Sequence, residues 1–196
     1  LDITSPATPQ LVGEFPTAGI CKNICVKDGY AFIAEWDQGL RIVDISTASN
    51  PTEVGYVDDD IVVGQVQVQG NYAYVAGEHS GFHVYDISDL SNPHRVSFID
   101  TLGRVVDVAV KGNYAYVLDR NTGVRIINVS DPSNAMQVSD YPFNTYVANV
   151  FIDGNVLYVT NYTLGVARFD ISNPTLPVLT GSLRVGSSIR GLAVQD

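Results

Sequence analysis

Lysine, cysteine and histidine are all scarce in this chain, and each scarcity argues against a class of function. The only lysines are Lys22, Lys27 and Lys111, and the formal net charge is −10. A nucleic acid backbone needs a basic stripe on the protein, and none exists here, so nucleic acid is not an expected partner. The acidic balance suits a surface outside the cytoplasm, although charge alone does not assign a compartment.

The two cysteines, Cys21 and Cys25, are not expected to form a disulfide. Four positions apart on one strand, they would lie about 13 Å from each other, beyond the ~7 Å limit for Cα atoms of a disulfide. We expect both to be small buried residues rather than reactive thiols or metal ligands. No run approaches the ~20 apolar residues of a membrane span, and no signal peptide is seen, so a processed or excised chain is expected.

Motifs for catalysis and cofactor binding are also missing. The histidines all fall between His79 and His94, without the helical spacing that zinc ligands use. There is no nucleophile elbow or phosphate-binding loop. The acidic run Asp58–Asp60 lacks the alternating acids and the glycine of a calcium loop. We therefore expect no cofactor, no metal and no enzymatic activity.

The chain is instead dominated by one recurring stretch. Gly112–Ser130, GNYAYVLDRNTGVRIINVS, has three counterparts at a constant interval, which is marked by the glycines Gly39, Gly81, Gly123 and Gly165. A period of about 40–45 residues, the range in which this interval falls, is typical of four-stranded propeller blades. Four full periods and part of a fifth fit in the chain, with repeats beginning near positions 1, 40, 82, 124 and 166. We expect residues 1–196 to form a single β-propeller domain or propeller segment.

Each period predicts four antiparallel strands. In one copy the inner strand is Arg104–Val110, and a Gly-Asn turn leads to a second strand, Tyr114–Leu118. The second strand is apolar on both faces, as expected where blades pack face to face. A half-exposed third strand, Val124–Val129, follows a variable loop. The outer strand, such as Pro93–Ile99, begins with proline, which is typical of sheet edges. The fold class is therefore all-β.

The third strands carry the motif by which the chain resembles a known family. They read Leu40-Arg-Ile-Val-Asp44 and, in the later copies, Phe82 to Asp86, Val124 to Asn128 and Val166 to Asp170. This pattern resembles the LVIVD-repeat family, whose members are propellers of secreted or cell-surface bacterial and archaeal proteins. The resemblance implies an extracellular, cell-surface or periplasmic location and supplies no catalytic motif. Asn128, Ala135 and Arg168 depart from the pattern. The repeated aspartates Asp44, Asp86 and Asp170 are expected to bond to the local backbone and start the turn that follows the strand.

The ring does not close with this chain alone. Five full periods would be longer than the chain, which has 196 residues. In a five-bladed ring, Leu1–Phe15 would complete the blade opened by Ser188–Val194 and would still lack a strand. We expect a ring of five or more blades, completed by another chain or by the rest of a longer polypeptide.

The loops on one face differ in every copy while the turns on the other face are nearly identical, and loops carry function on a rigid scaffold. We therefore predict a non-enzymatic binding or assembly module that presents this face to a protein or glycan. A hydrolase or lyase at the channel mouth, using Asp107, Asp59, His79 and Tyr146, and a structural element of a surface array are the alternatives. The predicted partner-binding residues are Trp36, Asp37, Asp59, His79, Arg104, Arg120, Tyr146, Tyr162 and Arg190. The predicted channel lining is Asn23, Gln65, Asp107 and Asn149.

Overall fold

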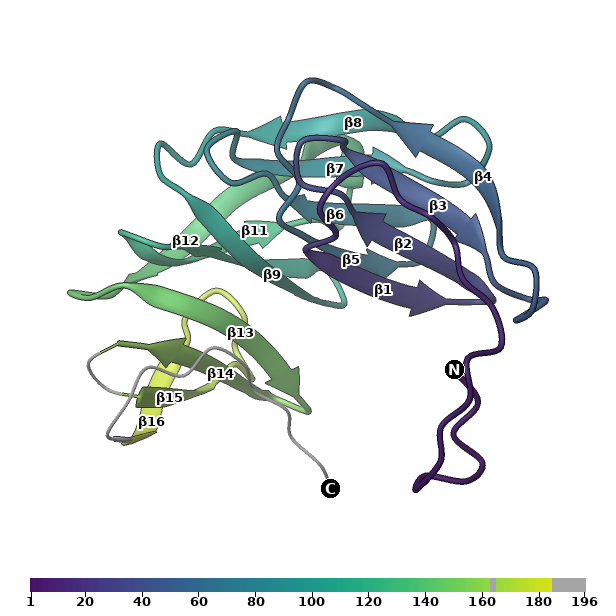
Figure 1. The fold of residues 1–196 in the computed structure, drawn as a ribbon. Coiled ribbons are helices and arrows are strands. Elements are labelled where there is room, and N and C mark those ends of the chain that lie inside the picture. The colour runs from purple at the N-terminus through teal and green to yellow at the C-terminus, as the bar shows by residue number, and fades with distance from the viewer. Residues whose placement is uncertain (163–164, 185–196) are drawn as a thin grey trace.

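The computed structural model describes residues 1–162 and 165–184, which form four antiparallel sheets of four strands each (Figure 1). Strand order follows chain order in every sheet, so each sheet is one blade. The blades are β1 (Asn23–Lys27), β2 (Tyr30–Ala34), β3 (Leu40–Asp44) and β4 (Thr52–Val57); β5 (Gln65–Gln69), β6 (Tyr72–Ala76), β7 (Phe82–Asp86) and β8 (His94–Ile99); β9 (Val105–Lys111), β10 (Tyr114–Asp119), β11 (Gly123–Asn128) and β12 (Met136–Pro142); and β13 (Val147–Asp153), β14 (Val156–Asn161), β15 (Gly165–Asp170) and β16 (Val178–Leu183). The predicted all-β propeller architecture is confirmed.

The glycine that marks the period directly precedes the third strand in the first two blades and is its first residue in the other two, and the backbone there favours glycine. Its φ is 78° at Gly39, 91° at Gly81 and 120° at Gly123, in the left-handed region that other residues rarely enter. A Cβ at Gly81 would also overlap the carbonyl oxygen of Ile99 in the outer strand β8. The fixed period in the sequence therefore reflects a close approach between the third and fourth strands.

The core lies between blades rather than within them. Phe32, Tyr74 and Tyr116 occupy one repeat position, and each lies in a different one of the three clusters between neighbouring blades. Each of the three aromatic side chains is 2% exposed or less. The prediction that these rings fill the spaces between blades, rather than stack on a ligand, is confirmed for these three.

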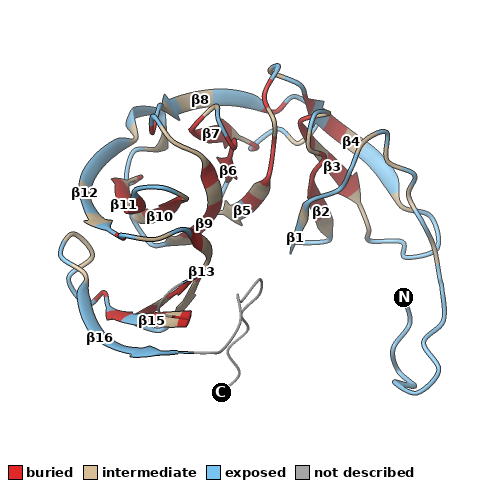
Figure 2. Ribbon diagram, turned by 60° about the vertical axis from the view of Figure 1, so that its left-hand side comes forward, coloured by how far each residue is buried: buried red, intermediate tan, exposed pale blue. Residues whose placement is uncertain are grey.

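The inner strands also form hydrogen bonds to the corresponding turn of the next blade. Lys27 Nζ donates to the Gly70 carbonyl at 2.7 Å, and Gln69 Nε2 donates to the Gly112 carbonyl at 2.7 Å. Lys111 repeats the bond between the third and fourth blades. Figure 2 shows the inner strands β1, β5, β9 and β13 nearest the centre of the arc. Each blade is therefore fixed to its neighbour both by apolar packing and by hydrogen bonds at the inner edge.

The aspartates at the ends of the third strands start the turns that follow, as predicted. Oδ1 of Asp44, Asp86 and Asp170 accepts a hydrogen bond at 2.8 Å from the backbone N–H of the serine two positions on. Hydrogen bonds from the same serine hold the pKa of each aspartate below its ordinary value. Asn128 makes the equivalent bond at 2.9 Å, so this departure from the repeat preserves the turn.

The expectation that both cysteines are buried is wrong. The first strand begins at Asn23 rather than Ile20, which leaves Cys21 outside the sheet and exposed, while Cys25 is partly buried. The outer face of β1 has no blade of the described residues packed on it, and Ile24 and Val26 are each 59% exposed there. The first blade therefore presents an open apolar face.

The expectation of a half-exposed third strand is also wrong for the second blade. His83 in β7 is 1% exposed, because it packs against Phe98 of the outer strand with ring centroids 5.0 Å apart. Burial, followed by the nearby charge of Arg95, lowers the pKa of His83 to about 4. A neutral imidazole is therefore part of the packed structure at pH 7.

Residues 9–15 take the place of an outer strand on the open face of the first blade. Gly13 lies one period before Gly55, and a Cβ at either glycine would overlap a backbone carbonyl oxygen. The two carbonyl groups, of Ala48 and of Leu90, are themselves one period apart. Phe15 packs on the outer face of this blade. The segment thus corresponds to strand four of a preceding blade. Ser188–Val194, expected to belong to the same blade, lies outside the described residues.

Candidate functional site

In each of the first three blades, one residue of the loop between the second and third strands is fixed against the next blade. Trp36 forms an isolated β-bridge with Val63, and Glu78 forms one with Val105. The φ angles of Trp36 and Glu78 are 38° and 52°, a conformation that is uncommon for residues with side chains. Arg120 repeats the contact through its carbonyl, which accepts a hydrogen bond from the fourth blade. This repeated loop residue is therefore held at a defined place on the variable-loop face.

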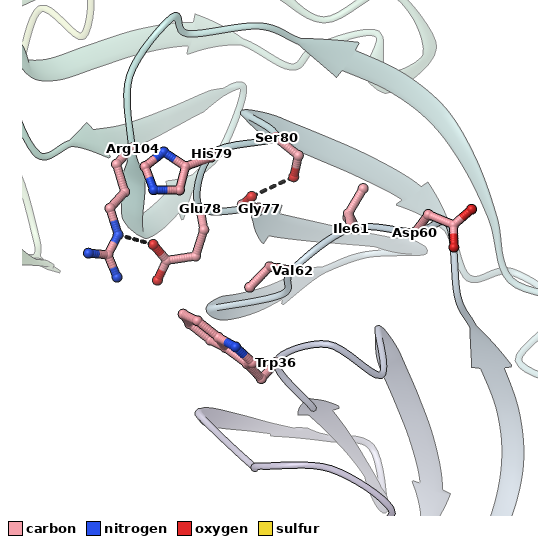
Figure 3. A pocket seen from close by; sticks show the side chains of 9 residues that line it. All are labelled: Trp36, Asp60, Ile61, Val62, Gly77, Glu78, His79, Ser80 and Arg104. Carbon is pink, nitrogen blue, oxygen red and sulfur yellow. Dashed lines mark hydrogen bonds and ion pairs between the residues drawn. The ribbon is translucent and has the colours of Figure 1, made fainter.

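A cavity of about 500 Å³ opens on this face where the first three blades meet (Figure 3). The indole of Trp36 lies across the cavity from Glu78 and Arg104, with His79 beside Glu78. Glu78 is 7% exposed, and its Oε2 accepts a hydrogen bond from Arg104 Nε. That bond raises the pKa of Arg104. The cavity therefore has an aromatic wall opposite a charged wall.

Two cations stack on aromatic rings of the variable-loop face. Lys22 Nζ lies 4.3 Å from the ring centroid of Trp36, and the guanidinium of Arg120 lies 5.3 Å from that of Tyr146. Tyr146 in turn meets Tyr162 edge to face, with centroids 6.3 Å apart. Tyr146 also lines a second cavity of about 510 Å³ in the loops of the third and fourth blades. An arc of aromatic and basic side chains thus runs along the loop face.

Buried ion pairs lie directly before two of these loop residues. Glu35, which precedes Trp36, is fully buried, and its Oε2 accepts a hydrogen bond from Arg41 at 3.0 Å. Asp119, which precedes Arg120, is also fully buried and lies 3.6 Å from Arg125 Nε. Each pair joins the start of the loop to the third strand of its own blade. The loops are therefore anchored by charge as well as by backbone bonds.

The other predicted partner-binding residues are less closely associated with the cavity. Asp37 is exposed in the first loop. Asp59 lies 3.7 Å from Arg95 on the outer strand β8 and does not line the cavity; its neighbour Asp60 does. Arg190 lies outside the described residues. Among the predicted residues, Trp36, His79 and Arg104 are brought together by the cavity, and Arg120, Tyr146 and Tyr162 continue the arc.

The four predicted channel residues lie on inner strands, but two of them bond between blades. Asp107 Oδ2 accepts a hydrogen bond from the Val150 N–H at 2.9 Å, and Asn23 Oδ1 accepts one from the Val66 N–H at 3.1 Å. Asp107 is 8% exposed, and burial raises its pKa to about 6 against the opposing effect of its hydrogen bonds. Gln65 and Asn149 are partly buried.

Sequence reasoning missed two members of the site, Glu78 and Lys22. Glu78 occupies the same repeat position as Trp36, Arg120 and Tyr162, which are all predicted partner-binding residues. The alignment of the repeats could therefore have identified it. The sequence contains no feature that predicts the role of Lys22, because its contact with Trp36 forms only when the start of the first strand lies beside the end of the second. Within residues 1–162 and 165–184, no three His, Cys, Asp or Glu side chains gather into a metal-binding group.

Four units of the chain match a family described as LVIVD repeat, at residues 18–59, 62–101, 102–142 and 145–185. Each unit coincides with one observed blade, from inner strand to outer strand. The chain belongs to the LVIVD repeat family. No curated protein matches it at a significant level.

Two solved structures that resemble this LVIVD repeat chain are computationally designed proteins. Ika8 superimposes with a TM-score of 0.73 at 13% identity, over 90% of this chain and 53% of its own. Ika4 superimposes with a TM-score of 0.65 at 10% identity, over 83% of this chain and 98% of its own. This chain thus spans about half the length of Ika8, and the likeness concerns the fold. No helix in the described part of the chain is long and apolar enough to cross a membrane.

Proposed function

We propose that this LVIVD repeat chain is a non-enzymatic binding and assembly module outside the cytoplasm, and that its variable-loop face receives a protein or glycan partner. The observation that carries the proposal is the cavity formed by Trp36, Glu78 and Arg104, because these residues come from loops of three different repeats. Aromatic and arginine side chains dominate the energetics of many binding surfaces. The anchored loop backbones hold them in place before a partner arrives.

The alternative of a hydrolase or lyase receives less support, because its candidate residues have separate partners. Asp59 pairs with Arg95, while Asp107 accepts backbone hydrogen bonds between blades. Tyr146 packs with Tyr162. General acid–base catalysis needs such groups to converge on one reacting bond. A purely structural role in a surface array would not require a charged cavity on the variable face.

Paired substitution of Trp36 and Arg120 by alanine tests the binding face. The full chain and the variant are compared on immobilised glycans and on proteins extracted from the surface of the source cells. We expect the variant to lose binding, whereas Asn113→Ala, exposed in a turn on the opposite face, retains it. Binding that survives the double substitution contradicts this site.

The exposed face of the first blade supports the assembly part of the proposal. Ile24 lines a groove of about 640 Å³ together with Phe15 and Ile33, and Val26 is equally exposed on the same strand. The groove lies where the other blades carry a neighbour, so its expected occupant is a further blade. That blade is supplied by another chain or by the rest of a longer polypeptide. An apolar surface of this kind marks an interaction site.

The mass of the protein isolated from its source shows whether the further blade belongs to another chain or to the same polypeptide. A chain of 21.2 kDa that migrates as a larger assembly indicates another chain, and a longer polypeptide indicates an internal blade. Ile24→Asp should weaken the assembly or, within one polypeptide, lower its stability. Unchanged association and stability in that variant refute the docking of a blade here. Recovery of the protein with the cytoplasmic fraction refutes the proposed location.

A further inference from the structure

We propose that the variable-loop face binds a carboxylate-bearing sugar chain, an oligouronate, along the arc from Trp36 to Tyr162. The inference rests on the proposed function, since it names the ligand class of the same face. It is drawn from three features: basic groups in an otherwise acidic chain, aromatic rings beside them, and two cavities in succession along the arc.

The basic groups are available to an anion. Lys22 and Arg120 stack on aromatic rings and make no ion pair with an acid in the described part of the chain. Arg104 pairs with Glu78 through Nε. The guanidinium of Arg120, which has no acidic partner among the described residues, suits bidentate recognition of a carboxylate.

The aromatic groups suit the apolar faces of sugar rings. Tyr146 and Tyr162 are 55% and 47% exposed, and Trp36 lines the first cavity. A pyranose has an apolar face of C–H groups and a polar rim, so it can pack on such a ring while its rim hydrogen-bonds to neighbouring charged groups. Glu78, at the wall of the first cavity, is placed to accept hydrogen bonds from sugar hydroxyls.

The arrangement along the arc suits a polymer. The cavities of about 500 Å³ and 510 Å³ lie in successive inter-blade loops, and each falls in the size range of small-ligand sites. A peptide bound by strand addition would need an unpaired backbone edge, but Trp36 and Glu78 are already bridged to Val63 and Val105. The observations therefore favour successive sugar units over an extended acidic peptide.

Calorimetric titration of the full chain with defined hexasaccharides tests the inference. The probes are oligomers of galacturonate, mannuronate and glucuronate, together with fully methyl-esterified oligogalacturonate, which keeps the sugar rings and removes the charge. We expect at least one acidic oligomer to bind, with an affinity that falls as the salt concentration rises from about 50 to about 200 mM, because screening weakens exposed charge interactions. If that oligomer is galacturonate, its ester should bind at least about tenfold more weakly.

Single substitutions distinguish binding at this site from a general effect of the protein's net charge. Arg120→Gln should weaken binding by about tenfold, the effect of losing one charge-assisted hydrogen bond. Lys111→Gln removes the same charge from the opposite face and should leave the affinity unchanged. Arg104→Gln is a secondary variant, because it leaves Glu78 buried without its partner.

Two results overturn the inference and spare the proposed function. The first is that esterified and acidic oligomers bind with equal affinity. The second is that neutral glycans or proteins bind, while no acidic oligomer binds at millimolar concentration. If no glycan and no surface protein binds to the chain, both the inference and the proposed function are refuted. Equal losses of affinity in Lys111→Gln and Arg120→Gln would mean that only the net charge matters, and this result would also contradict the proposed site.

Discussion

Replacing Asp119 by asparagine should reveal how strongly the buried ion pair anchors the loop that carries Arg120. The side chain of Asp119 is fully buried, that of Arg125 is 19% exposed, and Asp119 Oδ2 lies 3.6 Å from Arg125 Nε. Removing one member of a buried pair costs about 3–5 kcal/mol, because the other charge stays buried without its partner. Arg125 keeps hydrogen bonds to the Thr101 carbonyl at 2.6 Å and to Gln137 at 2.9 Å, so we expect the lower end, about 3 kcal/mol.

A second substitution, in an ion pair of similar length but high exposure, tests whether burial determines the loss of stability. Asp28 lies 3.8 Å from Lys27, nearly the same separation, but its side chain is 81% exposed. Asp28→Asn should change the free energy of unfolding by about 0–1 kcal/mol, as surface pairs do, and asparagine accepts the positive φ of 51° at this position. For Asp119→Asn the expected loss corresponds to a fall in Tm of about 6–12 °C.

Urea unfolding followed by tryptophan and far-ultraviolet signals gives both free energies. Trp36 reports on the first blade, while Asp119 lies in the third, so agreement of the two signals also shows whether the blades unfold together. Equal effects of the two substitutions, or a loss below about 1 kcal/mol for Asp119→Asn, would refute the argument that burial gives this pair its importance.

Two further predictions concern His83 and the period-marking glycine. His83 has a folded pKa of about 4, below its ordinary value of about 6.5, so its contribution to stability is present above about pH 6.5 and is lost as the pH falls toward about 4. His83→Phe should flatten this loss in unfolding measurements from pH 7 to pH 4, and an unaltered profile counts against the buried neutral imidazole. Gly81→Ala should lower the free energy of unfolding by about 2–4 kcal/mol, from left-handed backbone strain and overlap with the Ile99 carbonyl. Gly181→Ala, where no atom lies within 4 Å of the added Cβ, is the matched control, and equal losses would contradict this reason for the period.

The fold could be predicted from the sequence because its most constrained positions carry distinctive residues. The glycine at the start of the third strand is required by backbone geometry, so it recurs without slippage, and the buried second strand recurs as an apolar run. Inner-strand starts were less predictable: Ile20 and Val62 were assigned to strands that in fact begin at Asn23 and Gln65. Val62 lines the first cavity instead, and Ile20 is 62% exposed.

The site was only partly predictable because its contacts join different repeats. Loop variation singled out Trp36, Arg120 and Tyr162, but the pairing of Glu78 with Arg104 depends on how two blades are rotated against each other. The same reason explains Asp107. Its place on an inner strand predicts channel lining, and its carboxylate also accepts a hydrogen bond from the backbone of the next blade.

Every junction between the described blades uses the same strand faces, and the inner-strand bonds recur at one fixed offset. Duplication of the coding sequence for one period would therefore add a blade whose two faces already match those of its neighbours, without inventing a new interface. The loop residue that follows the second strand would be copied with it, and it could then diverge while the scaffold stayed intact. Adding a blade and diversifying the variable loops are in this way separate genetic events.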